Sequence, residues 1–301
     1  MRLAPALFRA ALLCSSLALA PSARASEELA TLNDEFDAPN LSSEWKLFHQ
    51  EYGWANHVKA LKVENGALRL EPYHSAWVRD RYAPFLFKTV EGDFDVRARV
   101  RVRSAAGEVP AGTWSLGGLI ARLPNGSRAG SWEPRRENWN FITTGVGHVA
   151  GEIMTETKGT YNSTSSLKLR PFERGWVELR LVRVGMTMFA LARPDARSPW
   201  RLRDRWYRMD TPPWSRAATM EVGLIAYTTS PDAPARDENP EVNNRTVNKD
   251  AKVDMILDVD WIRYARPKET AGTDWYAQVS AANTLADGNL SEAEVLRRLG
   301  D

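Results

Sequence analysis

Polar and apolar residues alternate strictly in one segment of the chain. Every second residue from Phe94 to Val102 is apolar, and charged side chains stand between them: Asp95, Arg97, Arg99 and Arg101. Successive side chains on a strand point to opposite faces, so the pattern predicts a strand with one buried and one wet face. A helix would place these arginines around its whole circumference and bury some of them. Because parallel sheets are covered on both faces, a half-wet strand favours an antiparallel sheet.

Further alternating or apolar runs recur along the chain, separated by turn residues. They cover residues 60–64, 67–71, 116–123, 140–146, 149–157, 177–181, 186–192, 221–227 and 255–265. Asn65-Gly66 separates the first two runs and is a strong signal for a two-residue hairpin. Helical periodicity is nearly absent before residue 270. The pattern predicts an all-β fold, a two-sheet antiparallel β-sandwich of the jelly-roll type.

The first 25 residues have the composition of a secretory signal peptide. A basic start at Arg2 precedes a short apolar core and the small-x-small sequence Ala23-Arg24-Ala25. We therefore predict cleavage after Ala25 and a secreted or periplasmic protein. The alternative is a retained membrane anchor, although the apolar run is short and broken for a transmembrane helix, and no other segment reaches that length.

Removal of this segment changes the charge of the protein. It carries three arginines and no acid, so the 40 basic residues fall to 37 against 38 acidic ones. A near-neutral chain gives no support for generic binding to nucleic acid or to an anionic membrane surface. The arginines of residues 97–103 then line a solvated face and discourage edge-to-edge pairing of strands. Cys14 is the single cysteine, so the mature chain has neither a disulfide nor a thiol nucleophile.

The mature chain is long enough to bury one core without covalent crosslinks, and we predict one domain over residues 26–266. Two long polar loops, residues 124–138 and 229–254, interrupt the strand pattern, and long loops tend to be functional. Residues 267–301 form a C-terminal extension. In it, Ser291 and Glu294 make a capping box that predicts a short terminal helix with an apolar stripe.

The order of the strand motifs resembles the concanavalin A-like lectin and glucanase superfamily. The opening segment is Leu32 to Asp37 followed by Trp45, and the closing segment is Leu257 to Tyr264. Between them, motifs at 92–96, 117–122, 137–141, 176–180 and 222–227 come in the expected order. This order is similar to the branch labelled "regulation of enolase" and to the accessory sandwich of some β-xylosidases. The resemblance covers roughly residues 32–266 and implies the sandwich fold and a carbohydrate ligand.

The chain contains twelve tryptophans, and sugars stack their apolar faces on exposed aromatic rings. The candidate ligand-binding residues are Trp54, His57, Trp77, Arg122, Trp132 and Trp139. Core packing is the alternative for any large aromatic side chain. We favour it for the three strand residues Trp45, Trp176 and Trp261. Polar or glycine neighbours leave both interpretations open for Trp54, Trp132 and Trp139.

Residues 151–156 place two carboxylates, Glu152 and Glu156, on one face of a predicted strand. The segment resembles the Glu-x-Asp-x-Glu strand of laminarinase-type glucanases, and this resemblance implies Glu152 as nucleophile and Glu156 as acid/base. Met154 stands where that family has its central Asp. Retaining hydrolysis needs two carboxyls with separated pKa values, and a methionine supplies no charge to separate them. A coincidental pair on an exposed strand face is the alternative.

The same superfamily implies a structural calcium ion. Its glucanases hold Ca²⁺ with an Asp on the last strand and a backbone carbonyl after the first hairpin, which correspond to Asp260 and Gly66. Asp34 or Glu35 would lie nearby, and oxygen ligands suit Ca²⁺. A surface ion pair between Asp260 and an arginine such as Arg263 is the alternative. The four histidines lack the close spacing of a zinc site, and no pattern indicates another cofactor.

Together these features favour a secreted β-sandwich that binds a polysaccharide or oligosaccharide by aromatic stacking. The alternative is a polysaccharide hydrolase or lyase that uses Glu152 and Glu156. A third hypothesis is a structural protein that docks to a partner through the acidic 229–254 loop. The sequence leaves the glycan and the oligomeric state open.

Overall fold

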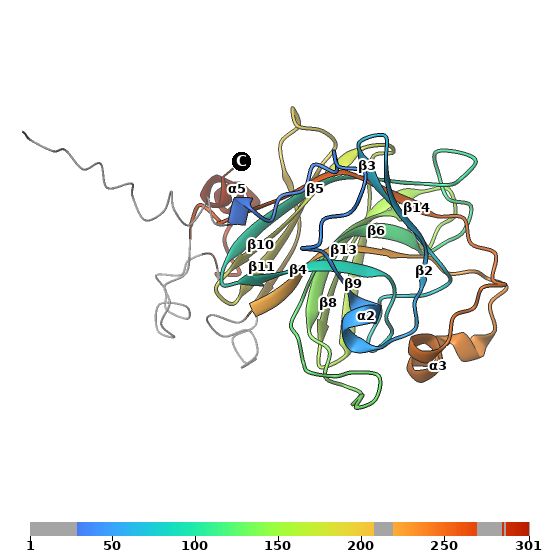
Figure 1. Cartoon of the computed structure of the whole chain (residues 1–301). Coiled ribbons are helices and arrows are strands. Elements are labelled where there is room, and N and C mark those ends of the chain that lie inside the picture. The colour runs from blue at the N-terminus through green and yellow to red at the C-terminus, as the bar shows by residue number, and fades with distance from the viewer. Residues whose placement is uncertain (1–28, 208–218, 270–284, 286, 301) are drawn as a thin grey trace, which may run out of the picture.

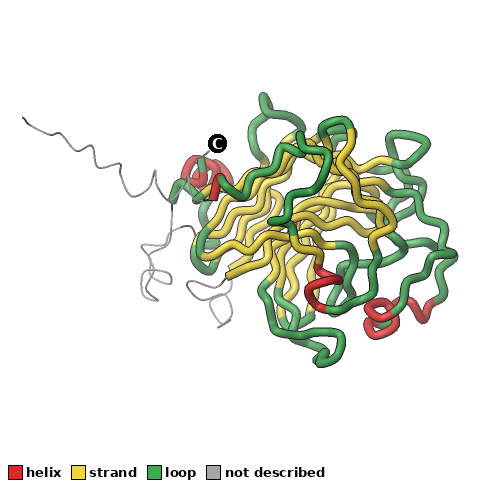
Figure 2. Tube along the Cα trace, in the orientation of Figure 1, coloured by secondary structure: helices red, strands yellow, loops and turns green. Residues whose placement is uncertain are grey.

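Two seven-stranded antiparallel sheets pack face to face in a computed structural model of the chain (Figure 1, Figure 2). The structure describes residues 29–207, 219–269, 285 and 287–300. The predicted all-β sandwich is confirmed. The predicted signal peptide, residues 1–25, lies outside the described residues.

We call the two layers sheet 1 and sheet 2. Sheet 1 has the strand order β1 (Lys46–Leu47), β4 (Phe85–Glu91), β13 (Thr219–Tyr227), β6 (Ser115–Arg122), β7 (Trp139–Val146), β8 (Ile153–Tyr161), β9 (Thr164–Pro171). Sheet 2 has the order β12 (Arg201–Tyr207), β11 (Thr187–Arg193), β10 (Val177–Val184), β5 (Phe94–Arg103), β14 (Ile256–Ala265), β3 (Ala67–Pro72), β2 (Val58–Glu64). The early strand β3 pairs with the last strand, β14, so the beginning and the end of the sandwich sequence lie side by side.

The main hydrophobic core lies between the sheets. Leu119, Ile142 and Leu224 of sheet 1 and Val100 and Leu257 of sheet 2 belong to it, and each is fully buried. Burial of one such side chain contributes about 1.5–3 kcal/mol. The alternation of the sequence therefore determines which face of each strand turns inward.

The strand with the strict alternation, β5, lies in the middle of sheet 2. It pairs with β10 on one side and with β14 on the other. Its apolar residues enter the core, and Arg97, Arg99, Arg101 and Arg103 lie half-buried on the outer face. The predicted role of these arginines at a sheet edge is wrong, because both edges of β5 are already paired.

The predicted hairpin at Asn65-Gly66 is confirmed between β2 and β3. Both residues have positive φ, 53° and 71°, which matches the twist that a two-residue turn requires. Asn tolerates this backbone region better than most residues, and Gly adopts it without a steric cost.

Short helical segments of the described residues lie at the periphery of the sandwich: α2 (Phe48–Tyr52), η2 (Ala235–Glu238), α3 (Pro240–Arg245) and α5 (Glu292–Leu299). Figure 1 shows α5 at one end of the sandwich and α2 and α3 toward the other. The predicted terminal helix is confirmed, because the Ser291 side chain accepts a hydrogen bond from the Glu294 amide and Val295 and Leu299 are buried against sheet 2. In the described part of the chain, no helix combines the length and the apolarity of a membrane span.

Candidate ligand-binding site

The outer face of sheet 1 is covered by a second hydrophobic cluster. We define the aromatic cluster as Phe48, Trp54, Trp77, Tyr82, Phe85, Phe87, Trp139, Phe141 and Tyr227. Strands β4, β7 and β13 contribute the residues that stand on the sheet, while α2 and the segment before β4 lay Phe48, Trp77 and Tyr82 over them. Sheet 1 is therefore buried on both faces, although antiparallel sheets often leave one face wet.

The aromatic cluster contains three of the predicted sugar-stacking tryptophans. The rings of Trp77 and Trp139 meet edge to face with centroids 5.9 Å apart, and Trp139 stacks on Phe141 at 5.3 Å. Trp54 is 6 % exposed, and Trp77 and Trp139 are fully buried. Their ring faces contact other side chains, so this structure does not present them to a sugar. Trp132 lies at the margin, partly buried, with its ring edge-on to Trp54 at 6.2 Å.

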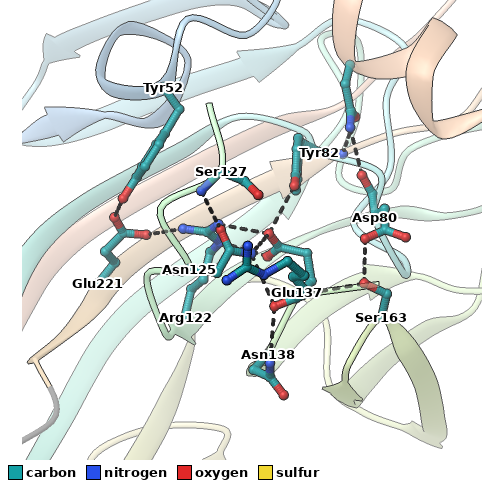
Figure 3. Close-up of polar contacts among 12 residues, drawn as sticks. Tyr52, Asp80, Tyr82, Arg122, Asn125, Ser127, Glu137, Asn138, Ser163 and Glu221 are labelled. Carbon is teal, nitrogen blue, oxygen red and sulfur yellow. Dashed lines mark hydrogen bonds and ion pairs between the residues drawn. The ribbon is translucent and has the colours of Figure 1, made fainter. Parts of the chain in front are cut away.

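Beside this cluster, the fully buried Arg122 forms a charged network (Figure 3). Its Nε donates to Glu137 Oε2 at 2.8 Å, and its Nη1 donates to Glu221 Oε2 at 2.7 Å. Burial alone would lower the pKa of Arg122, but the two carboxylates outweigh it and hold this pKa well above the usual value. Arg122, which was predicted to bind ligand, therefore uses its hydrogen-bond donors in contacts within the protein.

Tyrosine hydroxyls complete this network. Tyr82 Oη donates to Glu137 at 2.9 Å, and Tyr52 Oη donates to Glu221. Burial, reinforced by the Glu221 charge, raises the pKa of Tyr52, so its hydroxyl keeps the proton it donates. The network joins α2, the segment before β4 and the loop before β7, and it thereby fixes the cover of sheet 1 in place (Figure 3).

His57 is buried in the segment just before β2. Its Nε2 donates to the main-chain oxygen of Asn243 at 2.8 Å, which links the start of β2 to α3. Burial lowers the pKa of His57 to about 4, so the imidazole is neutral at neutral pH. A neutral, hydrogen-bonded histidine at this place ties two surface segments together.

The two predicted catalytic glutamates lie in different environments. Glu152 is exposed in the turn before β8, whereas Glu156 is fully buried on β8. Glu156 accepts a hydrogen bond from Tyr227 Oη, and its Oε1 forms an ion pair with Lys158 Nζ at 2.8 Å. Within the described residues, no hydrogen bond or ion pair joins Glu152 to Glu156.

A pocket of 450 Å³ opens next to the aromatic cluster, beside Lys158 of β8 and Tyr227 of β13. Its walls come from three segments that are far apart in sequence: His74 to Arg81, Thr113-Trp114, and residues 229–238 of the predicted long loop. Leu167 of β9 closes one side and is 44 % exposed.

Lys158 is the central charged group of this pocket. Although only 3 % exposed, it lines the pocket, and its Nζ donates to the main-chain oxygen of Trp77 at 3.0 Å besides pairing with Glu156. Burial raises the pKa of Tyr227 well above the usual value and the Glu156 charge adds to it, so Tyr227 remains a hydrogen-bond donor to Glu156. Of the predicted ligand-binding residues, Trp77 alone lines this pocket. The sequence analysis did not select Lys158, Arg81 or Tyr227.

The predicted calcium ligands have protein partners in this structure. Asp260 accepts from Arg99 Nη1 at 2.7 Å, and Asp34 accepts from Trp45 Nε1 at 2.8 Å. Glu35 pairs with Arg263, and Gly66 lies in the β2–β3 turn. Among the residues that the structure describes, no group of three His, Cys, Asp or Glu side chains could hold a metal ion. The calcium site stays a prediction.

Trp176 and Trp261 differ from the expected core packing. Both are partly exposed and line a groove on the outer face of sheet 2. Arg99 and Arg101 lie over the Trp176 ring, and Arg263 lies 4.4 Å from the centre of the Trp261 ring. The register shift of β14 between Val259 and Trp261 explains the second case, since a bulge places two successive residues outside the core. The core interpretation is confirmed for Trp45, which is 7 % exposed.

Comparisons with known proteins place the fold. No protein-family model matches the sequence, and no curated protein matches it. A GH43 protein from Bacillus licheniformis is 12% identical, with a TM-score of 0.50 over 78% of this chain and 39% of that one. A functionally unknown protein from Saccharomyces cerevisiae is 15% identical, with a TM-score of 0.48 over 71% and 95% of the two chains. A pseudo β-1,3-glucanase of Mycobacterium tuberculosis is 13% identical, with a TM-score of 0.45 over 78% and 97%.

The chain has the concanavalin A-like sandwich fold. It spans less than half of the Bacillus licheniformis protein, so the likeness concerns one part of that protein. At such identities the likeness establishes the fold and leaves the chemistry to the residues of this chain. The resemblance to the branch labelled "regulation of enolase" stays a prediction.

Proposed function

We propose that the protein is a secreted carbohydrate-binding protein whose glycan occupies the pocket beside the aromatic cluster. One observation carries the proposal: the pocket joins apolar walls to hydrogen-bonding groups on the outer face of the sheet. Trp114 and Leu167 supply apolar surface, and Lys158, Arg81 and Glu238 supply polar groups. A sugar offers the matching combination of an apolar ring face and hydroxyls, and small-ligand sites commonly have this composition.

The lysine in the pocket retains capacity for a ligand. An ammonium has three N–H donors, and Lys158 uses one of them in its hydrogen bond to the Trp77 main-chain oxygen. A remaining donor can bond a sugar hydroxyl, while the ion pair with the buried Glu156 neutralises the charge. The lysine is thereby held in one position, and a preorganised donor costs less ordering on binding.

The hydrolase alternative has less support from the geometry. Retaining hydrolysis uses a carboxyl pair about 5–5.5 Å apart around the scissile bond. Here Glu152 is exposed ahead of β8, and both oxygens of the buried Glu156 already have partners in Lys158 and Tyr227. Binding without turnover fits this arrangement better.

Calorimetric titration with a panel of oligosaccharides and polysaccharides tests the proposal. We expect binding that weakens at least tenfold in Trp114→Gly, a change that suits the positive φ of 53° at this position. Trp176→Ala, on the outer face of sheet 2, serves as the matched control and should bind like the wild type. The absence of binding at millimolar glycan, or equal affinity in Trp114→Gly, would refute the proposed site.

Secretion is a separate part of the proposal. It rests on the composition of residues 1–25 and predicts a mature chain that begins at Ser26. Mass spectrometry of protein recovered from the culture medium or the periplasm tests it. Recovery of the chain with Met1 to Ala25 attached to the membrane would favour the retained anchor.

A further inference from the structure

The pocket contains a partly buried arginine without a charged partner. In the described part of the chain, the Arg81 guanidinium forms no ion pair and no hydrogen bond. Four arginines of the groove on sheet 2 differ, since Arg97, Arg99, Arg193 and Arg263 each pair with a carboxylate. Arg81 is thus an arginine that burial partly deprives of water and with which no carboxylate of the described residues forms an ion pair.

The surroundings of Arg81 favour the binding of an anion. Burial lowers the pKa of Arg81, and the nearby Arg79 charge adds to this effect. Only Glu238 opposes it, from η2 and beyond ion-pair distance. A desolvated guanidinium is costly unless an anion and hydrogen bonds satisfy it, and a bound ligand can provide both.

Resting on the proposed function, we propose that the pocket takes an acidic glycan and that Arg81 binds the carboxylate of a uronic acid residue. The guanidinium fork matches a carboxylate with two parallel hydrogen bonds. The apolar surface of Trp114 and Leu167 favours a sugar over a free inorganic anion, because an inorganic anion gains nothing from it. Lys158 lines the same pocket and adds a second cation, which its pairing with Glu156 partly offsets.

Glu238 then acts as a specificity residue whose negative charge opposes the binding of acidic sugars. Its side chain is exposed, lines the pocket and attracts Arg81. The carboxylate of the ligand competes with Glu238 for the Arg81 guanidinium, and the two negative charges repel each other. Removal of the Glu238 charge therefore strengthens the binding of acidic sugars and leaves neutral sugars unaffected.

The test compares matched ligands and matched variants. Oligogalacturonates are titrated beside the same oligomers with methyl-esterified carboxyls, which keep the sugar and lose the charge, and beside sulfated oligosaccharides. We expect the free acid to bind at least tenfold more tightly than the ester. Arg81→Gln should remove this preference, Arg81→Lys should retain part of it, and Glu238→Gln should increase it. Arg79→Gln is the control, because Arg79 is the neighbouring arginine that does not line this pocket.

The outcomes separate this inference from the proposed function. Equal binding of acid and ester, or an unchanged preference in Arg81→Gln with an unchanged thermal midpoint, overturns the acidic glycan while the carbohydrate site stands. A preference for sulfated over carboxylated oligomers also overturns the carboxylate assignment. Failure of every glycan to bind refutes the proposed function itself.

Discussion

Arginine–carboxylate pairs lie on the outer face of sheet 1 and on the uncovered part of the outer face of sheet 2, and these two groups of pairs differ in their access to water. Arg122 of sheet 1 is fully buried with Glu137 and Glu221. On sheet 2, the side chains of Arg99 and Asp260 are 40% and 33% exposed. At an exposed site, formation of an ion pair contributes little, because both charges are already well hydrated. At a buried site, removal of one partner is costly, because it leaves the other charge without solvent or a counterion. The segments that cover an ion pair, and not the pair itself, therefore determine how much stability is lost when one partner is removed.

The cover exists on sheet 1 because its outer face is apolar. Phe85, Phe141 and Ile225 stand on that face and attract α2 and the segment that carries Trp77. On the outer face of β5 the corresponding positions are arginines, which need water or an acid. Among the described residues, α5 covers sheet 2 near β10 and β11.

The largest test of this contrast removes the buried guanidinium. We expect Arg122→Met to lower the free energy of unfolding by about 3–5 kcal/mol, because two buried carboxylates lose their counterion. Urea denaturation at neutral pH measures the change. Addition of Glu137→Gln and Glu221→Gln to this variant should recover part of the loss. A loss below about 1 kcal/mol would mean that water reaches this network and that the two faces do not differ as described.

Burial of His57 should also make the stability of the protein depend on pH. His57 has a pKa of about 4 in the fold, because of burial, against 6.5 when unfolded. Below pH 6.5 the unfolded chain binds a proton that the folded chain does not, so stability falls as the pH drops toward 4. We expect His57 to contribute a loss of about 2 kcal/mol between pH 7 and pH 5.

Comparison of variants isolates this histidine. His57→Gln keeps a donor for the Asn243 carbonyl and should flatten the pH dependence of the urea midpoint. His148→Gln changes an exposed histidine in the turn before β8 and should not. An identical pH slope in the wild type and His57→Gln would contradict the assignment.

A smaller effect is expected where sheet 2 is covered by α5. Ser291 accepts a hydrogen bond from the Glu294 amide at 3.2 Å, and Arg180 donates to the main-chain oxygens of Leu299 and Gly300 at the other end of the helix. Ser291→Ala should cost about 1 kcal/mol because the helix loses its cap. Thermal unfolding measures it, and Ser291→Asp, which can also cap, should retain most of the stability.

The smallest effect is expected on the open face. Arg99→Met removes the exposed pair with Asp260, and such pairs contribute about 0–1 kcal/mol. The change should shrink further in 1 M salt, which screens surface charges. A loss comparable to that of Arg122→Met would show that the open groove holds a tightly coupled network.

The strands were predictable where one face is dry and the other wet. The alternation located β5, and Asn65-Gly66 located the β2–β3 hairpin. Four strands were not predicted: the two-residue strand β1, and β4, β9 and β12. β4 is buried on both faces for most of its length and has no alternation, while β9 and β12 are edge strands with few buried positions. Hydrophobic periodicity detects a strand whose two faces differ in polarity, and in these strands the two faces are similar.

The candidate site was only partly predictable. Trp54, Trp77 and Trp139 do lie over or on the outer face of sheet 1, but the aromatic cluster buries them. Arg81 and Lys158 carry no motif, and only the packing of separate segments makes them pocket residues. One usable signal was present: Lys158 follows Glu156 at the strand period on the same face, where a lysine and a glutamate can pair.

By itself the sequence determined the all-β sandwich, the hairpin and the terminal helix with its cap. These depend on alternation, turn residues and capping, which are local properties of the chain. Only the tertiary structure decided which charges are buried with Arg122, why Arg81 forms no ion pair with a described residue and where the pocket opens. Those features depend on which distant segment covers which face, and desolvation acts on a side chain only after that cover has formed.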